Sequence, residues 1–394
     1  TLLASSAASD VYKRQVYNHT YYSYSWLERT VPGYWNRRWE NGSLTNGSGC
    51  GCDLASERTM VRKYLVDSCV YWAKEYHIDG FRFDLMALHD VETMNAIRAA
   101  LDALPGGEDI LMYGEPWQGG STRMEHGAIP ANKQAAGLLD SRIGFFCDNT
   151  RDAIKGGVFN AGSAGYINGD MHCGYQVLHS IPAWRGGQAD FMPQAPGQVV
   201  QYVSAHDNYT LWDKLKCVAR RGDYAAPDAD LLAQNRMAAG IYLTCQGLPF
   251  MQGGEEFART KHGDHNTYRG PLELNRLDWT RAAQLEELVQ YYHGLLKIRK
   301  AYPELSGMAG DAEPCILSLP GWLIGFVPER RGESLPGRLA VYYNPERTRQ
   351  WAALPAGSWR YLCDGTRAAA EPFGPACRNA IELAPVSVTI LKVE

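Results

Sequence analysis

The sequence predicts an α/β protein in which a parallel sheet with flanking helices is followed by an antiparallel β module. Between Val16 and Pro303, short apolar runs alternate with amphipathic helical patterns, which is typical of parallel α/β architecture. After Pro303, short strands follow one another with Gly, Pro and Asn turns between them, which is typical of antiparallel sheets. The 394 residues suffice for one large domain and a smaller one.

The first part of the chain contains six predicted strands. Each is a short apolar run bounded by turn residues or by a helical pattern. One strand ends at Val16–Tyr17, and the others are expected at Ile78–Phe83, Ile110–Tyr113, Ile143–Phe146, Val199–Ser204 and Pro249–Gln252.

Four main helices are predicted among these strands. The first is expected to be capped by Ser56 and to carry apolar residues at helical spacing, namely Met60, Tyr64, Leu65, Cys69 and Trp72. The others cover Val91–Ala103, Leu231–Thr244 and Ala282–Lys300, and the last of them has a pronounced apolar face.

The segment 304–394 is predicted to form a C-terminal β-sandwich domain of about 90 residues. Turns such as Asn344–Pro345 and Asp364–Gly365 separate its apolar runs. Strands are expected at Ile316–Leu317, Trp322–Val327, Leu339–Tyr343, Trp359–Leu362 and Val386–Val393.

Six strands, each followed by a helix or a long loop, indicate a (β/α)8 (TIM) barrel that lacks its first two strands and most of the third. The shortfall coincides with Thr1–Gln15, which does not resemble the rest of the chain. It combines a small polar run, Ser5–Asp10, with the two cations Lys13 and Arg14. We interpret Thr1–Gln15 as a non-native segment joined by an assembly error, residues 16–303 as a partial catalytic barrel, and 304–394 as the sandwich.

Composition excludes several classes of partner. A net charge of −4 without a long basic run argues against nucleic acid, and no run reaches the roughly 20 apolar residues of a membrane span. The ten cysteines are scattered, and the one-residue gap between Cys50 and Cys52 does not suit a zinc knuckle. We interpret them as reduced thiols, which favours the cytoplasm over secretion.

Three acidic residues each follow a predicted strand. Asp84 ends Asp79–Asp84, Glu115 follows Leu111–Gly114, and Asp207 follows the predicted strand at Val199–Ser204. Catalytic side chains of a parallel barrel come from the carboxyl ends of several strands, so these acids are expected at one rim. Singly, each is more often a helix cap, but three together with Arg82, His19 and His206 favour a catalytic site.

Glycoside cleavage with retention needs this combination of side chains. One carboxylate acts as nucleophile, and a second carboxylic acid, roughly 5–5.5 Å away, donates a proton. Arg82 and Asp84 stand two residues apart on a strand, so they share a face, and the guanidinium favours an ionised nucleophile. Pro116 and Trp117 give Glu115 an apolar wall that suits a raised pKa.

Four short motifs match a known family in order along the chain: Val16–His19, Asp79–Asp84, Gly114–Trp117 and His206–Asn208. With them the chain resembles glycoside hydrolase family 13, the α-amylase family, from Val16 to Glu394. The resemblance implies that Asp84 is the nucleophile, Glu115 the general acid/base and Asp207 a residue that binds sugar hydroxyls in the transition state. It implies substrate-binding roles for His19, Arg82, His206, Asn208, Leu85 and Trp117.

Further segments resemble the type I debranching branch of that family. They are Asn46–Gly51, Leu85–Met86, Tyr209–Lys214, Gly247–Pro249 and Gly263–Asn266. Leu85 and Trp117 would border the acceptor side of the site, although packing at the barrel rim explains them equally well. The sequence departs from the family at Arg14, where the first motif has an aspartate, and a Tyr-Asn-Trp-Gly-Tyr-Asp-Pro marker expected before Val16 is absent.

The resemblance implies a retaining hydrolase of α-1,6 branch linkages in pullulan, glycogen and amylopectin limit dextrins. Isoamylase-type debranching, an α-1,4-acting amylase or neopullulanase, and a non-catalytic amylase-like protein or inactive fragment remain as alternatives. The expected partner is an α-glucan, with no nucleic acid or membrane, and the complete protein is expected to be a monomer. No cofactor is expected. Asp148–Asn149 offers oxygen ligands for calcium, but ordinary loop hydrogen bonding is the favoured interpretation.

Overall fold

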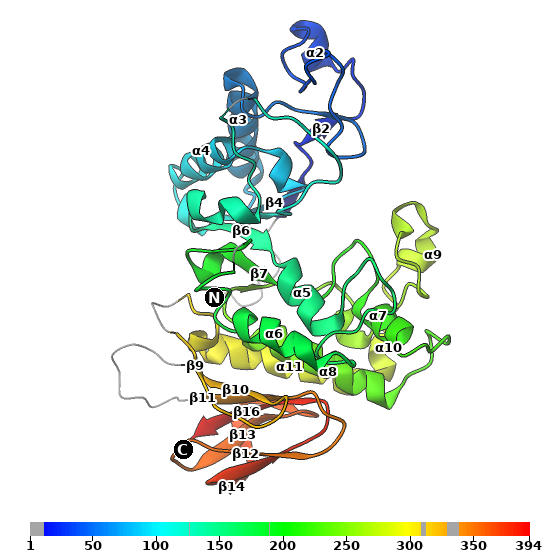
Figure 1. Ribbon diagram of the computed structural model, residues 1–394, viewed down its shortest axis with the longest axis vertical. Coiled ribbons are helices and arrows are strands. Elements are labelled where there is room, and N and C mark those ends of the chain that lie inside the picture. The colour runs from blue at the N-terminus through cyan, green and yellow to red at the C-terminus, as the bar shows by residue number, and fades with distance from the viewer. Residues whose placement is uncertain (1–11, 126, 189, 309–312, 329–338) are drawn as a thin grey trace. The chain divides into compact units, whose positions relative to one another are not determined.

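The computed structural model describes residues 12–125, 127–188, 190–308, 313–328 and 339–394 (Figure 1). The chain divides into two compact units. The first contains residues up to Phe146 together with Trp184–Val200, and the second contains Cys147–Ala183 and Gln201–Glu394.

The first unit is built on a parallel sheet in the order β1-β4-β5-β6-β7. All its neighbouring strands pair in parallel, with Gln15 opposite Phe83, Phe83 opposite Gly114 and Phe146 opposite Val200. The strands are β1 (Tyr12–Gln15), β4 (Gly80–Phe83), β5 (Leu111–Gly114), β6 (Ile143–Phe146) and β7 (Val199–Gln201). The backbone of Tyr12–Gln15 thus belongs to the sheet, while the origin of Thr1–Gln15 stays a prediction.

The strands β4, β5, β6 and β7 are rich in apolar residues, which is typical of parallel strands covered on both faces. Phe81, Phe83, Ile143 and Phe145 are fully buried. The helices α3 (Thr59–Tyr76) and α4 (Val91–Asp102) pack against each other. In the chain they alternate with β4 and β5, as is typical of β/α units.

A long loop after β1 carries two short strands and a short helix. β2 (His19–Thr20) pairs antiparallel with β3 (Cys52–Asp53), and α2 (Trp26–Thr30) lies between them in sequence. Register places His19 opposite Asp53.

The second unit combines helices with the C-terminal sheets. Its helices are α5 (Asp148–Lys155), α6 (Gly174–Ser180), α7 (Leu211–Val218), α8 (Ala229–Thr244), α9 (Leu272–Asn275), α10 (Trp279–Gln284) and α11 (Glu286–Ala301). The short strand β8 (Leu248–Pro249) is followed by Phe250, whose N–H donates to the carbonyl of Gln201 at 2.8 Å.

Two antiparallel sheets follow the helices of this unit. A six-stranded sheet runs β14-β13-β16-β11-β10-β9, and a two-stranded sheet pairs β12 with β15. Residues of both sheets, including Ala352, Trp359 and Ile381, share one buried cluster, while α8 and α11 pack against the larger sheet. The strands are β9 (Cys315–Ile316), β10 (Ile324–Val327), β11 (Leu339–Asn344), β12 (Gln350–Ala353), β13 (Trp359–Asp364), β14 (Ala368–Cys377), β15 (Ala380–Leu383) and β16 (Ser387–Val393).

The predicted parallel α/β part and β-rich C-terminal part are both present. The boundaries 16–303 and 304–394 stay predictions, since the β module shares a compact unit with α8 and α11. Within the described residues, no helix combines the length and apolar character needed to cross a lipid bilayer.

Several local predictions were wrong. The strand predicted to end at Val16–Tyr17 ends at Gln15. Ser56 does not cap α3, whose N-cap is Arg58; instead Ser56 Oγ donates to Asp90 Oδ2 at 2.6 Å. The helix expected at Ala282–Lys300 is interrupted at Leu285, which separates α10 from α11. Asp148 and Asn149 begin α5 rather than lying in a loop.

Candidate active site

Arg82 and Asp84 come from the carboxyl end of β4. Phe81 and Phe83 point into the apolar core, and the alternation of a strand turns Arg82 to the other face. Arg82 is only 7 % exposed, and its Nη1 donates to Asp84 Oδ1 at 2.5 Å. This contact places a fixed positive charge beside the carboxylate and favours its ionised form.

Glu115 follows β5, the neighbouring parallel strand. Arg82 Nη2 donates to Glu115 Oε1, so one guanidinium contacts both carboxylates. The other oxygen, Oε2, accepts the backbone N–H of Leu85 at 2.8 Å. Leu85 adopts a left-handed conformation (φ 40°, ψ 54°), which is rare for a leucine and turns its N–H toward Glu115.

Asn18 and His19 reach the same carboxylate from the loop after β1. The fully buried Asn18 donates from Nδ2 to the Asp84 carbonyl at 2.7 Å and to Asp84 Oδ2 at 3.4 Å. Its Oδ1 lies 2.5 Å from His19 Nδ1. Since Asn18 Oδ1 can only accept, this contact favours the tautomer with a proton on Nδ1.

Burial lowers the pKa of His19 below its ordinary value, against the opposing effect of the Asp84 and Asp53 carboxylates. His19 is therefore expected to be neutral at physiological pH, with Nε2 able to accept a hydrogen bond.

The loop Thr45–Asp53 contacts His19, since Asp53 pairs with His19 in the short sheet of β2 and β3. The buried Asp53 accepts hydrogen bonds from Thr45 Oγ1 at 2.7 Å and from the Gly47 N–H at 2.8 Å. At Gly51 a Cβ would lie 2.4 Å from the Thr20 carbonyl, so only glycine allows this approach. Asn46–Gly51, predicted from resemblance alone, thus shapes the loop under His19.

Leu85 and Trp117 were predicted to border the acceptor side. Leu85 contacts Glu115 through its backbone, as described above. Trp117 is half-buried in the segment after Glu115, which is tied to the Asn46–Gly51 loop by hydrogen bonds from the Gly119 and Gly120 N–H groups to the Gly47 carbonyl.

His206, Asp207 and Asn208 lie in the second unit, in the loop after β7. His206 Nε2 is 3.3 Å from Asp207 Oδ2, and both side chains are exposed. Asn208 has a positive φ of 63°, which its short polar side chain tolerates better than most residues do. The loop therefore presents a His–Asp pair to solvent.

Sequence reasoning missed the residues that hold this loop. Lys261, 2 % exposed, donates from Nζ to the His206 carbonyl at 3.3 Å and to Thr267 Oγ1 at 3.0 Å. The buried Asp213 in turn accepts the Lys261 N–H at 2.7 Å and the Thr260 hydroxyl at 2.5 Å. Burial raises the pKa of Asp213 and lowers that of Lys261. The sequence gives no clear signal for Lys261, which lies among the polar residues Arg259, Thr260 and His262, and its partners His206 and Asp213 are distant in sequence.

Asn18 was also missed as a site residue, although it belongs to the quoted motif Val16–His19. The structure brings Arg82, Asp84, Leu85 and Glu115 into direct hydrogen-bond contact and joins His19 to them through Asn18. In the second unit it joins His206 to Asp207.

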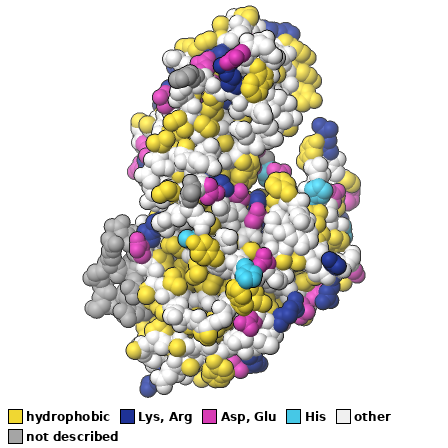
Figure 2. Space-filling model, in the orientation of Figure 1, with side chains coloured by type: hydrophobic (Ala, Val, Ile, Leu, Met, Phe, Trp, Pro, Cys, Tyr) yellow, Lys and Arg dark blue, Asp and Glu magenta, His cyan; other side chains and the backbone are white. Residues whose placement is uncertain are grey.

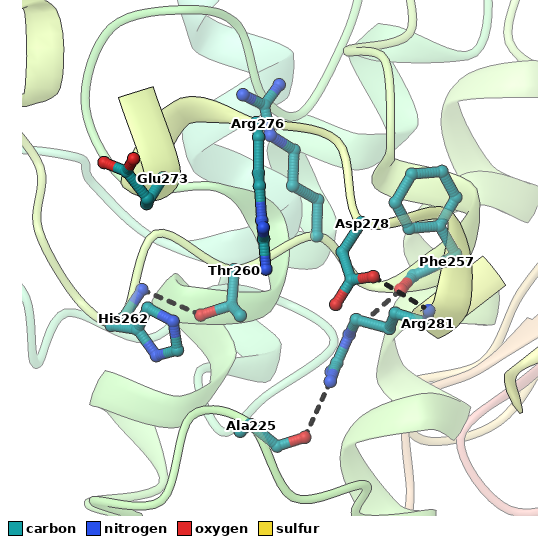
Figure 3. A pocket seen from close by; sticks show the side chains of 9 residues that line it. Ala225, Phe257, Thr260, His262, Glu273, Arg276, Asp278 and Arg281 are labelled. Carbon is teal, nitrogen blue, oxygen red and sulfur yellow. Dashed lines mark hydrogen bonds between the residues drawn. The ribbon is translucent and has the colours of Figure 1, made fainter. Parts of the chain in front are cut away.

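Two surface cavities lie away from these residues. One, of about 110 Å³, is lined by residues of the second unit that include Arg259, Arg276, Asp278 and Arg281 (Figure 3). Arg281 points across it and donates from Nη1 to the Ala225 carbonyl at 2.6 Å. The other, of about 220 Å³, belongs to the first unit, and its arginines are paired with glutamates, as Arg37 is with Glu57 and Arg58 with Glu125. Neither is lined by a predicted site residue.

The first-unit cluster offers two carboxylates at the ends of adjacent parallel strands, held by one arginine. Such an arrangement suits an acid and a nucleophile that act on one bond between them.

Comparison with known proteins gives a consistent result. No family model matches the chain. It is 40% identical over 299 residues to the pullulanase of Bacillus subtilis (strain 168), covering 73% of this chain and 39% of that protein. The solved structure of a pullulanase from Bacillus acidopullulyticus superposes with a TM-score of 0.88 at 34% identity, covering 97% of this chain and 46% of that one.

A third match is a pullulanase from Paenibacillus barengoltzii, solved in complex with maltohexaose and α-cyclodextrin. Its TM-score is 0.86 at 36% identity, covering 98% of this chain and 58% of that one. The chain thus spans between 39% and 58% of the length of these three proteins. Sequence identity of this level, extending over most of the chain, carries the family assignment. The chain belongs to glycoside hydrolase family 13, the α-amylase family, within its type I pullulanase branch.

Proposed function

We propose that the protein containing this chain is a retaining glycoside hydrolase that cleaves α-1,6 branch linkages in pullulan, glycogen and amylopectin limit dextrins. The observation that carries the proposal is the contact of Arg82 with both Asp84 and Glu115 at the ends of adjacent strands. The similarity to pullulanases, of which one was solved with maltohexaose, supports the substrate class.

In the proposed mechanism Asp84 attacks the anomeric carbon while Glu115 protonates the leaving oxygen. The bond from the anomeric carbon to that oxygen breaks, and a covalent glycosyl–Asp84 ester forms. Glu115, now ionised, takes a proton from water, which attacks the ester and regenerates Asp84. Asp207 would bind sugar hydroxyls, and His19 and His206 would hydrogen-bond the same sugar.

Arg82 has two roles in this scheme. It keeps Asp84 ionised, as a nucleophile requires. Its second contact also favours an ionised Glu115, so substrate must displace Arg82 Nη2 from Glu115 before Glu115 can act as an acid. Closure of the site over a sugar ring, with loss of water, would supply that change.

We further propose that the parallel sheet is part of a (β/α)8 barrel in the whole protein, and that the protein is a monomer requiring neither cofactor nor calcium. The cytoplasm is the proposed compartment, because all ten cysteines are present as thiols.

The first test replaces the two carboxylates in the whole protein. Asp84→Asn should abolish release of reducing ends from pullulan while pullulan binding stays measurable. Glu115→Gln should lose about 10²-fold or more, as expected for loss of a general acid. Proton NMR should show the α-anomer as the first product, and maltotriose should be the end product. Full activity of either variant, or a β-anomer as first product, would refute the assignment.

A further inference from the structure

Four exposed aromatic side chains gather in the loop that follows His19. Tyr21, Tyr22, Tyr24 and Trp26 are 67, 56, 56 and 81 % exposed. Exposed apolar residues scattered singly need no explanation, but four rings within six residues form a patch. Figure 2 shows hydrophobic side chains at the surface of the part of the molecule where Figure 1 labels α2.

The rings are ordered relative to one another. Tyr22 and Tyr24 stack with centroids 5.1 Å apart and an interplanar angle of 19°, and Tyr21 meets Tyr22 edge-on at 4.6 Å. The guanidinium of Arg29 lies 5.3 Å from the centroids of both Tyr24 and Trp26. Cation–π contacts of this kind hold flat rings in place at exposed sites.

A buried acid fixes the loop that carries the rings. Glu28, in α2, accepts backbone N–H groups from Gly33 at 2.6 Å and Trp35 at 3.1 Å, and the Arg38 guanidinium at 2.8 Å. These bonds lower the pKa of Glu28, although burial alone would raise it. The four rings Tyr21, Tyr22, Tyr24 and Trp26 form an aromatic platform on a loop held by these hydrogen bonds. Such a platform loses less conformational entropy when it binds a ligand.

The position of the platform links it to the candidate active site. Tyr21 directly follows β2, whose His19 contacts Asn18, and Asn18 donates to Asp84. The loop that carries the rings therefore begins within three residues of Asn18, which is hydrogen-bonded to the carboxylate proposed to react.

The chemistry of the platform suits a sugar chain better than an apolar protein face. Three of its rings carry a phenolic hydroxyl, and Ser23 and Ser25 separate the rings in sequence. A glucose ring presents an apolar C–H face bordered by hydroxyls, so it can stack on a ring while its edge exchanges hydrogen bonds with Tyr and Ser.

We propose that Tyr21, Tyr22, Tyr24 and Trp26 form a binding platform for an α-1,4-linked glucan chain that extends beyond the cleavage site. The proposal rests on the proposed function, and it assigns the platform to chain binding rather than to the chemical step. It adds affinity for long glucans and leaves the reacting groups unchanged.

The test measures binding by isothermal titration with maltohexaose and α-cyclodextrin, using the Asp84→Asn background of the whole protein to prevent turnover. Trp26→Ala should weaken maltohexaose binding about 2- to 10-fold, the range expected for loss of one aromatic contact. Trp26→Phe should restore much of the affinity. The matched control is Trp351→Ala in β12, which removes a tryptophan of similar exposure, 64 %, and should change nothing.

In the active protein, Trp26→Ala should raise KM for pullulan and leave kcat unchanged. Unchanged affinity and KM in Trp26→Ala would overturn the platform, even if Asp84→Asn is inactive and the proposed function stands. A dimer that Trp26→Ala converts to monomer, without loss of glucan affinity, would overturn it in favour of self-association. Loss of activity in Trp26→Ala at saturating pullulan would also overturn it, because the platform would then act in the chemical step.

Discussion

At the scale of single residues, the site depends on buried polar side chains whose donors and acceptors are hydrogen-bonded. Asn18 satisfies three atoms at once: the Asp84 carbonyl, the Asp84 carboxylate and His19 Nδ1. Removing one partner of a buried hydrogen bond leaves the other unsatisfied, which costs about 1–3 kcal/mol for each group.

Asn18→Leu, which keeps the volume but removes the amide, should therefore lower the free energy of unfolding by about 1–3 kcal/mol. It should also reduce kcat, because Asp84 and His19 lose their shared anchor. Urea denaturation and initial rates on pullulan measure the two effects. Ser43→Ala, in an exposed turn of the same loop, serves as control and should alter neither. A fully stable and active Asn18→Leu variant would contradict this role.

The sequence predicts Asp84, Glu115 and Asp207 as site residues because each follows a predicted strand. It did not reveal Asn18 as the anchor of Asp84, nor Lys261 as the anchor of His206, since these bonds join residues 66 and 55 positions apart. Strand ends are a local signal, whereas a hydrogen bond across the fold depends on register and packing that no local pattern encodes.

At the scale of secondary-structure elements, the second unit is held by a buried polar cluster around Glu255. Glu255 accepts hydrogen bonds from Ser204 Oγ at 2.6 Å, from Tyr242 of α8 at 3.0 Å and from Tyr292 of α11 at 3.2 Å. Burial raises the pKa of Glu255 to about 7, and burial lowers the pKa of Lys155 in α5 to about 7.

The raised pKa of Glu255 predicts a pH-dependent stability. The folded state retains this proton up to about pH 7, whereas the unfolded carboxyl loses it near the ordinary glutamate pKa of 4.5. Stability from this group is therefore present below pH 4.5 and falls as pH rises toward 7. A difference of one pH unit between the folded and unfolded pKa corresponds to about 1.4 kcal/mol, so the total effect is on the order of a few kcal/mol.

Glu255→Gln should remove that dependence. Urea denaturation at pH 5 and pH 7.5 should show the variant gaining stability relative to the wild type at the higher pH. Glu256→Gln, at the half-buried neighbour, is the matched control and should follow the wild type. Parallel curves for wild type and Glu255→Gln would show that Glu255 is ionised throughout.

The contact between α11 and β14 is equally specific. A Cβ added at Gly294 would lie 2.0 Å from the Ala368 carbonyl, so helix and strand approach as closely as glycine permits. Gly294→Ala should destabilise the protein by about 1–3 kcal/mol, as overpacking does, despite the better helix propensity of alanine. Thermal unfolding checks this, with the exposed neighbour His293→Ala as control. An unchanged or higher Tm for Gly294→Ala would mean that the strand moves away freely.

The elements predicted from sequence were those with strong apolar periodicity. β14 was missed because it contains Pro372, Gly374 and Pro375, which argue against a strand. It tolerates them because it is an edge strand with register shifts against β13. β12 and β15 were missed because they are short and carry exposed residues at alternate positions. The break between α10 and α11 at Leu285 was missed because no glycine or proline stands there to indicate the end of a helix.

At the scale of the whole molecule, the ten cysteines of this chain form no disulfide with one another. All ten cysteines lie among the described residues and are present as thiols. Their scattered positions in the sequence favour the same interpretation. Cys69, Cys147, Cys245 and Cys363 are buried, and burial raises the pKa of both Cys245 and Cys363 to about 12.

Reductant should therefore leave the Tm unchanged. Titration with a thiol reagent should detect ten thiols in urea. In the native protein the exposed Cys50 and Cys315 should react first and the four buried thiols last, because a buried neutral thiol is a poor nucleophile. Fewer than ten thiols in urea without reductant would reveal a disulfide.

The division into two compact units has a consequence for synthesis on the ribosome. The chain passes from one unit to the other three times, after Phe146, Ala183 and Val200. Until synthesis has passed Gln201 the growing chain lacks a complete β7, so β6 can pair with β7 only after the helices α5 and α6 have been made. Those two helices belong to a unit whose partners α8, α11 and the C-terminal sheets are translated only afterwards. During synthesis from the N-terminus, α5 and α6 therefore cannot pack against these partners until most of the remaining chain has been made. In that interval apolar residues such as Ile154 and Val177 are accessible to chaperones.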